Sequence, residues 1–181
     1  MNEDVHALTA IQWFNKGYDY DIQEDYENAI FAYSKAIELN PQDADAYINR
    51  GAVYDTQGEY DLAIEDYTKA IELNPQDVDT YTNRGAAYAG QGEYDLAIQD
   101  YTKAIALNSQ DADLYVNRGN AYTAKGDYDL AVTDYNQAIE LQPQAADFYI
   151  NKLIACEKSG QYDCGQIAAI KQKISELGGH S

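Results

Sequence analysis

The side chains that most often carry catalysis are scarce in this sequence and lie far apart. The two histidines are His6 and His180, near opposite ends of the chain, and the two cysteines are Cys156 and Cys164. An active site needs titratable groups that converge, and no Ser/His/Asp or Cys/His arrangement can be drawn from these positions. No glycine-rich phosphate loop and no stretch with the ligand spacing of a calcium loop is present. The sequence therefore predicts no enzyme, no metal site and no cofactor.

Acidic side chains dominate the charge of the chain. There are 31 Asp and Glu residues against 12 Lys and Arg, which gives a net charge of −19. Such a surface repels nucleic acid and anionic lipid and attracts partners that carry Lys or Arg. No run of 18 apolar residues is present, so we expect no membrane span.

The first ten residues, MNEDVHALTA, lack the basic region and apolar block of a signal peptide. We therefore expect a cytoplasmic protein, or a periplasmic one if an export signal has been removed ahead of Met1. Two cysteines are too few for a disulfide framework, which favours free thiols and leaves a bridge between Cys156 and Cys164 open.

A period of 34 residues organises the chain. Residues 44–77 and 78–111 are identical at 25 of 34 positions, a third copy covers 112–145, and a more divergent one covers 10–43. We number positions 1 to 34 from Ala10, Ala44, Val78 and Ala112, and continue the count from Ala146. A fixed period of this length is the signature of a repeat architecture.

Each copy predicts two helices. In the second copy, Tyr47, Gly51 and Tyr54 lie on one face of the first helix, and Gly58 ends it. Asp61 is expected to cap the second helix, which ends at Asn74-Pro75. Tyrosines recur at positions 4, 11, 17 and 24. A stacking surface for a ligand is one interpretation, but we favour large knobs that pack into small residues at positions 8, 20 and 27.

This pattern resembles the tetratricopeptide repeat. The second copy carries every signature residue of that family: Tyr47, Gly51, Tyr54, Gly58, Ala63, Tyr67, Ala70 and Pro75. The first copy has Trp13, Gly17, Tyr20, Ala29, Tyr33, Ala36 and Pro41, but Glu24 replaces the glycine of the turn. The resemblance implies an all-α, right-handed superhelix that binds other proteins and does not catalyse.

The repeats divide the chain into segments. We expect an N-terminal extension (1–9), four repeats (10–43, 44–77, 78–111 and 112–145), a degenerate capping repeat (146–177) and a tail (178–181). In the capping repeat, Leu153 replaces glycine, and Ile167, Ile170, Ile174 and Leu177 form one apolar face. The last repeat of a stack has no further neighbour, so a helical pair of this kind is needed to cover it.

In this family the first helices line a concave groove that holds extended peptides. Positions 2, 6, 9 and 13 form the corresponding stripe, and position 6 is asparagine in all five registers: Asn15, Asn49, Asn83, Asn117 and Asn151. Asparagine in mid-helix is unfavourable by roughly 0.5 kcal/mol relative to alanine. Its amide suits a grip on a peptide backbone, and the alternative is an internal hydrogen bond to a neighbouring repeat.

Position 2 of the three central copies adds Asp45, Asp79 and Asp113 to this stripe, and position 9 of the fourth adds Asn120. The Lys and Arg residues with which some relatives clamp a carboxylate are missing. We therefore predict a scaffold or adaptor for an extended basic or neutral peptide. The alternative is a self-associating structural module or assembly factor within a larger complex, so either a monomer or a weak homo-oligomer fits the sequence.

Arginine at position 7 accompanies aspartate at position 23. Arg50, Arg84 and Arg118 occur with Asp66, Asp100 and Asp134, whereas Lys16 and Lys152 occur with alanine. This correlation predicts partly buried ion pairs between helices, either within one repeat or between adjacent repeats.

Overall fold

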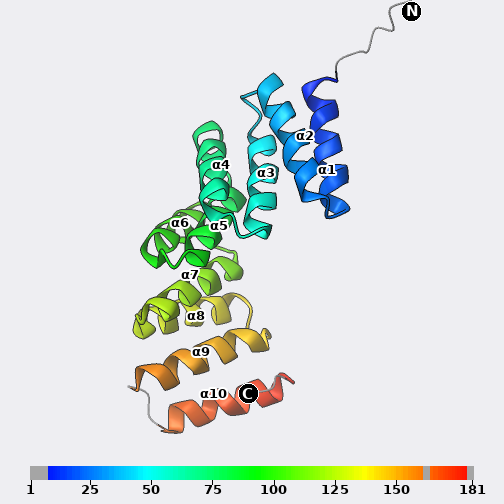
Figure 1. Ribbon diagram of the computed structural model, residues 1–181. Helices are drawn as coiled ribbons and strands as arrows, with labels where there is room; N and C mark the ends of the chain where they lie inside the picture. The colour runs from blue at the N-terminus through cyan, green and yellow to red at the C-terminus, as the bar shows by residue number, and fades with distance from the viewer. Residues whose placement is uncertain (1–7, 161–163, 179–181) are drawn as a thin grey trace, which may run out of the picture. The chain divides into compact units, whose positions relative to one another are not determined.

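The computed structural model describes residues 8–160 and 164–178. Within these residues the chain is helical, without strands, and it divides after Gly90 into two compact units (Figure 1). The N-terminal unit contains α1 (Ala10–Ile22), α2 (Tyr26–Leu39), α3 (Ala44–Thr56), α4 (Tyr60–Leu73) and α5 (Val78–Gly90). The C-terminal unit contains α6 (Tyr94–Leu107), α7 (Ala112–Lys125), α8 (Tyr128–Leu141), α9 (Ala146–Ser159) and α10 (Cys164–Glu176).

Successive helices within each unit pack against one another. In the N-terminal unit α1 pairs with α2, α3 packs on both α2 and α4, and α5 packs on α4. In the C-terminal unit the same order runs from α6 to α10. Each unit is therefore a stack of helical hairpins in chain order, as the repeats predict.

Left-handed residues make the turns inside the hairpins. Gly58, Gly92, Gly126 and Gly160 have φ values between 66° and 94°. Glu24 has a φ of 60° at the equivalent point of the first repeat. The first turn therefore keeps the geometry of the others, although its side chain is disfavoured there.

The core is built from one tyrosine and one glycine per repeat. A Cβ atom added to Gly17 would lie 2.6 Å from the Tyr33 ring, and one added to Gly119 would lie 2.7 Å from the Tyr135 ring. Tyr33 and Tyr135 are buried, as are the alanines at positions 20 and 27. The prediction that tyrosine knobs pack into small-residue holes is confirmed.

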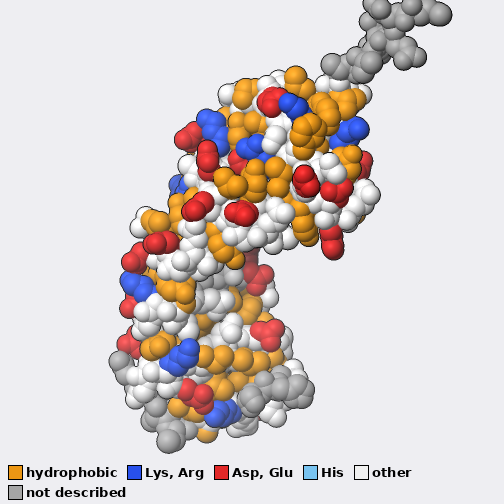
Figure 2. All heavy atoms as spheres, in the orientation of Figure 1, with side chains coloured by type: hydrophobic (Ala, Val, Ile, Leu, Met, Phe, Trp, Pro, Cys, Tyr) orange, Lys and Arg blue, Asp and Glu red, His pale blue; other side chains and the backbone are white. Residues whose placement is uncertain are grey.

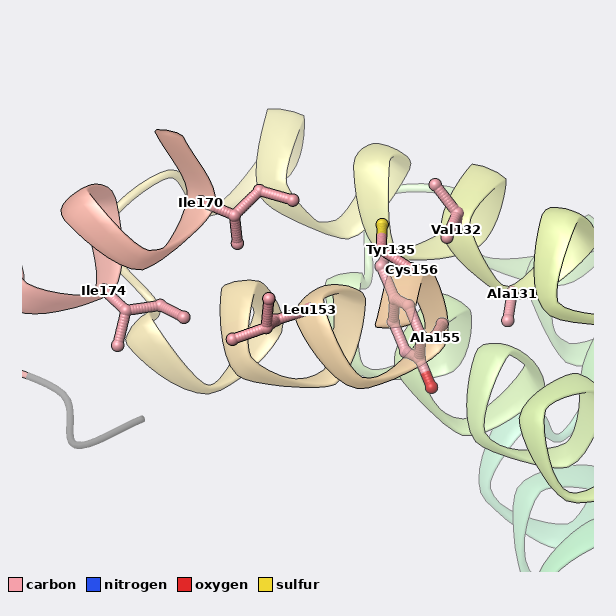
Figure 3. Packing of buried hydrophobic residues seen from close by; sticks show 8 residues of the cluster. All are labelled: Ala131, Val132, Tyr135, Leu153, Ala155, Cys156, Ile170 and Ile174. Atoms are coloured by element: carbon pink, nitrogen blue, oxygen red, sulfur yellow. The ribbon is translucent and has the colours of Figure 1, made fainter. Parts of the chain in front are cut away.

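The last hairpin replaces this scheme with aliphatic packing. Leu153 of α9 faces Ile170 and Ile174 of α10, and all three are buried (Figure 3). The same cluster includes Tyr135 of α8 and the buried thiol of Cys156. α10 therefore packs on α9 through aliphatic side chains where the full repeats place a tyrosine against a glycine.

Arginine at position 7 joins the helices of one repeat and reaches the repeat before it. The Arg50 Nη2 and Asp66 Oδ1 atoms lie 2.7 Å apart, and Arg50 Nη1 donates to the Ser34 hydroxyl at 2.9 Å. Arg118 makes the same contacts with Asp134 and Thr102. The Arg50 guanidinium also lies between the rings of Tyr47 and Tyr54.

The ion pairs were expected either within one repeat or between adjacent repeats, and the structure distinguishes these arrangements for two of the arginines. The ion pairs of Arg50 and Arg118 lie within one repeat. A hydroxyl at position 25 supplies the contact with the preceding repeat, and Arg84 likewise donates to Thr68 at 3.0 Å.

The expected cap of the second helices is wrong by two residues. α4 begins at Tyr60, so Glu59 is its N-cap, and Asp61 lies within the first turn. The Glu59 side chain makes no capping hydrogen bond. Asp61 is instead placed where a negative charge favours the helix dipole.

Candidate functional site

The asparagines of position 6 lie on the first helix of each repeat, and most keep their amides uncommitted. Asn49 Nδ2 donates to the carbonyl of Asp45, one turn earlier in α3, at 2.8 Å. Among the residues that the structure describes, the side chains of the other four make no hydrogen bond, and none of the five side chains bonds a neighbouring repeat. Asn15 is exposed, whereas Asn49, Asn83, Asn117 and Asn151 are half-buried.

The predicted aspartates lie in the first turns of α3, α5 and α7. Asp45, Asp79 and Asp113 are all exposed, and within the described part of the chain none forms an ion pair. Their charge favours the amino end of each helix and remains available to a partner.

Two predicted residues meet in one pocket of the C-terminal unit. Asn120 of α7 and Asn151 of α9 line a hollow of about 270 Å³. Its other lining residues are Thr123, Ala124, Tyr135, Ile154 and Lys158. Lys158 forms no ion pair with any residue that the structure describes. The pocket thus combines amides, one cation and an exposed isoleucine.

The floor of this pocket is closed by an internal hydrogen-bond network. The Tyr135 hydroxyl donates to Asn120 Oδ1 at 2.8 Å and lies 3.1 Å from Thr123 Oγ1. Burial raises the pKa of the Tyr135 hydroxyl, so it stays protonated near neutral pH. Asn120 therefore uses its oxygen inside the protein and keeps its amide hydrogens for a ligand.

The equivalent part of the first repeat is apolar. Positions 2, 9 and 13 of α1 carry Ile11, Tyr18 and Ile22, whose exposed fractions are 71%, 53% and 65%. Beneath them the buried Tyr33 hydroxyl has no hydrogen-bond partner among the described residues. A second hollow, of about 140 Å³, is lined by Ile11, Phe14, Asp43 and Asp45.

The groups that could have carried catalysis do not come together in the described chain. No cluster of three or more metal-ligating side chains is found among the described residues. Cys156 is a buried free thiol, and burial raises its pKa, which makes it unreactive. His6, His180 and the Cys164 side chain lie outside the described residues. Across the described helices, none has the length and apolar content needed to cross a membrane.

Sequence reasoning gave too little weight to two features. Ile11, Tyr18 and Ile22 stand at positions 2, 9 and 13 of the stripe, but only their exposure and the hollow beside them mark them as a surface of their own. The hydroxyls of Ser34, Thr68 and Thr102 were missed. Their signal was present, because serine or threonine stands at position 25 in each repeat that precedes an arginine.

Stacked helical hairpins with polar hollows on their first helices define an all-α repeat protein of the solenoid class. The sequence profile described as "Tetratricopeptide repeat" matches residues 44–77, 78–111 and 112–145, and one described as "TPR repeat" matches 17–58. The chain belongs to the tetratricopeptide repeat family. Members of this family are generally non-catalytic interaction modules, and this chain is a protein-interaction scaffold.

Solved structures of other repeat proteins resemble this fold. The crystal structure of MamA protein is 26% identical in sequence, with a TM-score of 0.86 over 93% of this chain and 91% of that one. YrrB, described as a TPR protein with an unusual peptide-binding site, is 23% identical, with a TM-score of 0.79 over 93% of this chain and 86% of that one.

A MamA fragment from Desulfovibrio magneticus RS-1 is 19% identical, with a TM-score of 0.85 over 93% and 94% of the two chains. Likenesses of such low identity establish the fold alone. No curated protein sequence matches the chain significantly.

Proposed function

We propose that this chain is a non-catalytic adaptor that holds an extended segment of a partner protein along the outer stripe of its first helices. The position-6 asparagines hold the backbone of the segment. The aspartates of position 2 favour Lys or Arg side chains. The amides of Asn120 and Asn151 take part in the C-terminal unit.

The observation that carries this proposal is the absence of hydrogen bonds from most of the asparagine side-chain amides. The side chains of these four asparagines make no hydrogen bond within the described chain: Asn15, Asn83, Asn117 and Asn151. An internal structural role would require such bonds, because asparagine is otherwise a poor choice in the middle of a helix. An amide with both donors and acceptors instead pairs with a peptide backbone of any sequence.

The charge of the chain supports the choice of partner. Its net charge is −19, and Asp45, Asp79 and Asp113 are exposed and unpaired within the described residues. Opposite charge on a partner speeds the encounter and makes the association sensitive to salt. We therefore expect peptides with Lys or Arg to bind more tightly as the salt concentration falls.

The test is peptide selection followed by a matched mutation. Peptides selected from a random displayed library against the whole chain are titrated by fluorescence anisotropy. The variant N15A/N83A/N117A/N151A is expected to bind about tenfold more weakly or worse, because several amide hydrogen bonds are lost together. Its unfolding temperature should not fall, because alanine is the better helix former.

The control for this test is N136A. Asn136 is exposed on α8, outside the stripe, and its replacement should leave the affinity unchanged. Equal binding by the wild-type chain and the fourfold variant would remove the proposed grip. A library that yields no binding peptide would count against the adaptor function itself.

A further inference from the structure

The largest apolar exposure on the first helices is concentrated in α1. Ile11, Tyr18 and Ile22 follow each other at the spacing of one helix face, and each is more than half exposed. The same positions in the other full repeats carry small or polar residues. They are Asp45, Ala52 and Thr56; Asp79, Ala86 and Gly90; and Asp113, Asn120 and Ala124.

Tyr18 also differs from the residue at the same position of the fourth repeat in the hydrogen bonding of the buried tyrosine. Asn120 stands at the same position of the fourth repeat and accepts a hydrogen bond from the Tyr135 hydroxyl. Tyr18 occupies that position in the first repeat, and the buried Tyr33 hydroxyl has no partner within the described chain. An unsatisfied buried hydroxyl and an exposed aromatic ring both disfavour the isolated protein, so Tyr18 is better explained by a contact with a partner.

Carboxylates lie beside this apolar face. Asp43, the N-cap residue of α3, and Asp45, in the first turn of α3, share a hollow with Ile11 and Phe14 of α1. The nearby cations are engaged elsewhere: Lys16 lies over the Trp13 ring, Lys35 pairs with Glu38, and Arg50 pairs with Asp66. In the face that Figure 2 shows, apolar and acidic side chains likewise adjoin one another on the N-terminal unit.

We propose that the face formed by Ile11, Tyr18 and Ile22, with the hollow beside it, is an anchor site for a partner segment that combines a bulky apolar side chain with an adjacent Lys or Arg. The apolar side chain packs on the isoleucines. The aliphatic stem of the basic residue lies on Phe14, and its charge meets Asp43 and Asp45. This inference rests on the proposed adaptor function and gives the chemistry of one anchor within it.

Other occupants fit the same surface less well. A symmetric dimer through this face would place the carboxylates of one copy near those of the other, which like charge disfavours. An anionic membrane would meet the same repulsion. A basic, apolar peptide satisfies both the isoleucines and the aspartates.

Four short synthetic peptides of equal length test the assignment with the full chain. They carry leucine with lysine, leucine with glutamate, serine with lysine, and serine with glutamate. Fluorescence anisotropy should show the leucine–lysine peptide binding about tenfold more tightly than the leucine–glutamate or serine–lysine peptide. Equal affinity for all four would overturn the proposal.

Two double variants then separate the apolar and the charged parts. I11S/I22S should lower the affinity for the leucine–lysine peptide about tenfold, and D43N/D45N should lower it less while reducing its dependence on salt. The matched control is L62S/L130S, which removes two exposed leucines on α4 and α8 and should change nothing.

The variant Y18N distinguishes a binding role from a structural one. It places in the first repeat the acceptor that Asn120 provides in the fourth, so the unfolding temperature should rise by about 2–4 °C. We expect the peptide affinity to fall at the same time. A rise in stability with unchanged affinity would overturn the assignment of Tyr18 to the anchor.

The outcomes also separate this inference from the adaptor function. If selected peptides bind and depend on the asparagines, but I11S/I22S has no effect, the anchor is wrong and the adaptor function stands. If the wild-type chain forms concentration-dependent oligomers that I11S/I22S abolishes, the occupant is a second copy and the proposal is overturned.

Discussion

Tyr33 in the first repeat and Tyr135 in the fourth pack in the same way, each against a glycine of the preceding helix. Their hydroxyls end in different surroundings. The Tyr135 hydroxyl bonds Asn120 and lies close to Thr123, whereas Tyr33 has no partner in the described chain. One repeat carries a polar hollow there, and the other carries an apolar face.

The comparison shows which positions of the repeat are bound to the fold and which are free to change. Glycine at position 8, tyrosine at position 24 and the alanines at positions 20 and 27 are retained in both repeats because the helices cannot approach without them. Position 9, on the outer stripe, and position 12, beside it, differ between the two repeats. Variation of that stripe on a constant frame is how one scaffold acquires different binding surfaces.

The largest loss of stability should come from a substitution in the helix packing that both regions share. R50M leaves the buried Asp66 carboxylate without its cation and should reduce the free energy of unfolding by about 3 kcal/mol in urea denaturation. Burial already raises the pKa of Asp66, so the loss should shrink as the pH is lowered and the carboxyl is neutralised. K69M, which removes the cation of an exposed pair on α4, is the control and should have almost no effect.

The glycines come next and test whether the two repeats are equivalent. G17A and G119A each force a methyl group against a tyrosine ring at less than 3.0 Å. Each should destabilise the chain by about 2 kcal/mol, less any gain in helix propensity. Thermal unfolding of the two variants should give similar shifts. A large difference would mean that the common packing is not equally important in both regions.

The first two repeats also differ from the fourth in carrying a titratable side chain at position 12. Asp21 and Asp55 of the first two repeats have pKa values raised by burial, whereas the fourth repeat has Thr123 there. A carboxyl whose pKa is higher in the folded chain stabilises the fold below its unfolded pKa, and this contribution is lost as pH rises through the folded value.

The unfolding temperature should therefore rise as the pH is lowered through the folded pKa values of these carboxyls toward their ordinary value of 3.8, and it is measured down to just above the isoelectric point of about 4.1. The double variant D21T/D55T places the residue of the fourth repeat at both sites. It should reduce the slope of this rise, and an unchanged slope would exclude these two groups as its source.

The smallest effect concerns the turn of the first repeat. Glu24 has a φ of 60°, where the equivalent residue of the fourth repeat is Gly126 with a φ of 94°. E24G should stabilise the chain by about 0.5 kcal/mol, because relief of the left-handed strain is partly offset by glycine's backbone entropy. Thermal unfolding should show that the unfolding temperature rises by about 1 °C to 2 °C, and a fall in this temperature would contradict the prediction.

The sequence predicts the helices and their packing well because each local sequence pattern recurs in several repeats. Tyr33, Gly17 and their equivalents recur at fixed spacing, so one weak preference is read several times over. The cap of α4 was misplaced because two acidic residues, Glu59 and Asp61, flank Tyr60, and composition does not say which one precedes the helix.

The candidate site is less predictable from sequence. That Ile11, Tyr18 and Ile22 lie on the stripe follows from periodicity, but their exposure depends on what the neighbouring hairpin leaves uncovered. That Asn120 would use its oxygen on Tyr135 depends on a contact between residues 15 positions apart. The functions of the stripe residues stay predictions.

The most direct test of the account is the side-chain amide signals of the asparagines in a nitrogen–proton NMR spectrum, recorded while a selected peptide is added. We predict that the signals of Asn15, Asn83, Asn117 and Asn151 shift with the peptide, while that of Asn136 stays in place. If the peptide binds and these four signals do not move, the asparagines are not the grip on the partner, and the central claim is wrong.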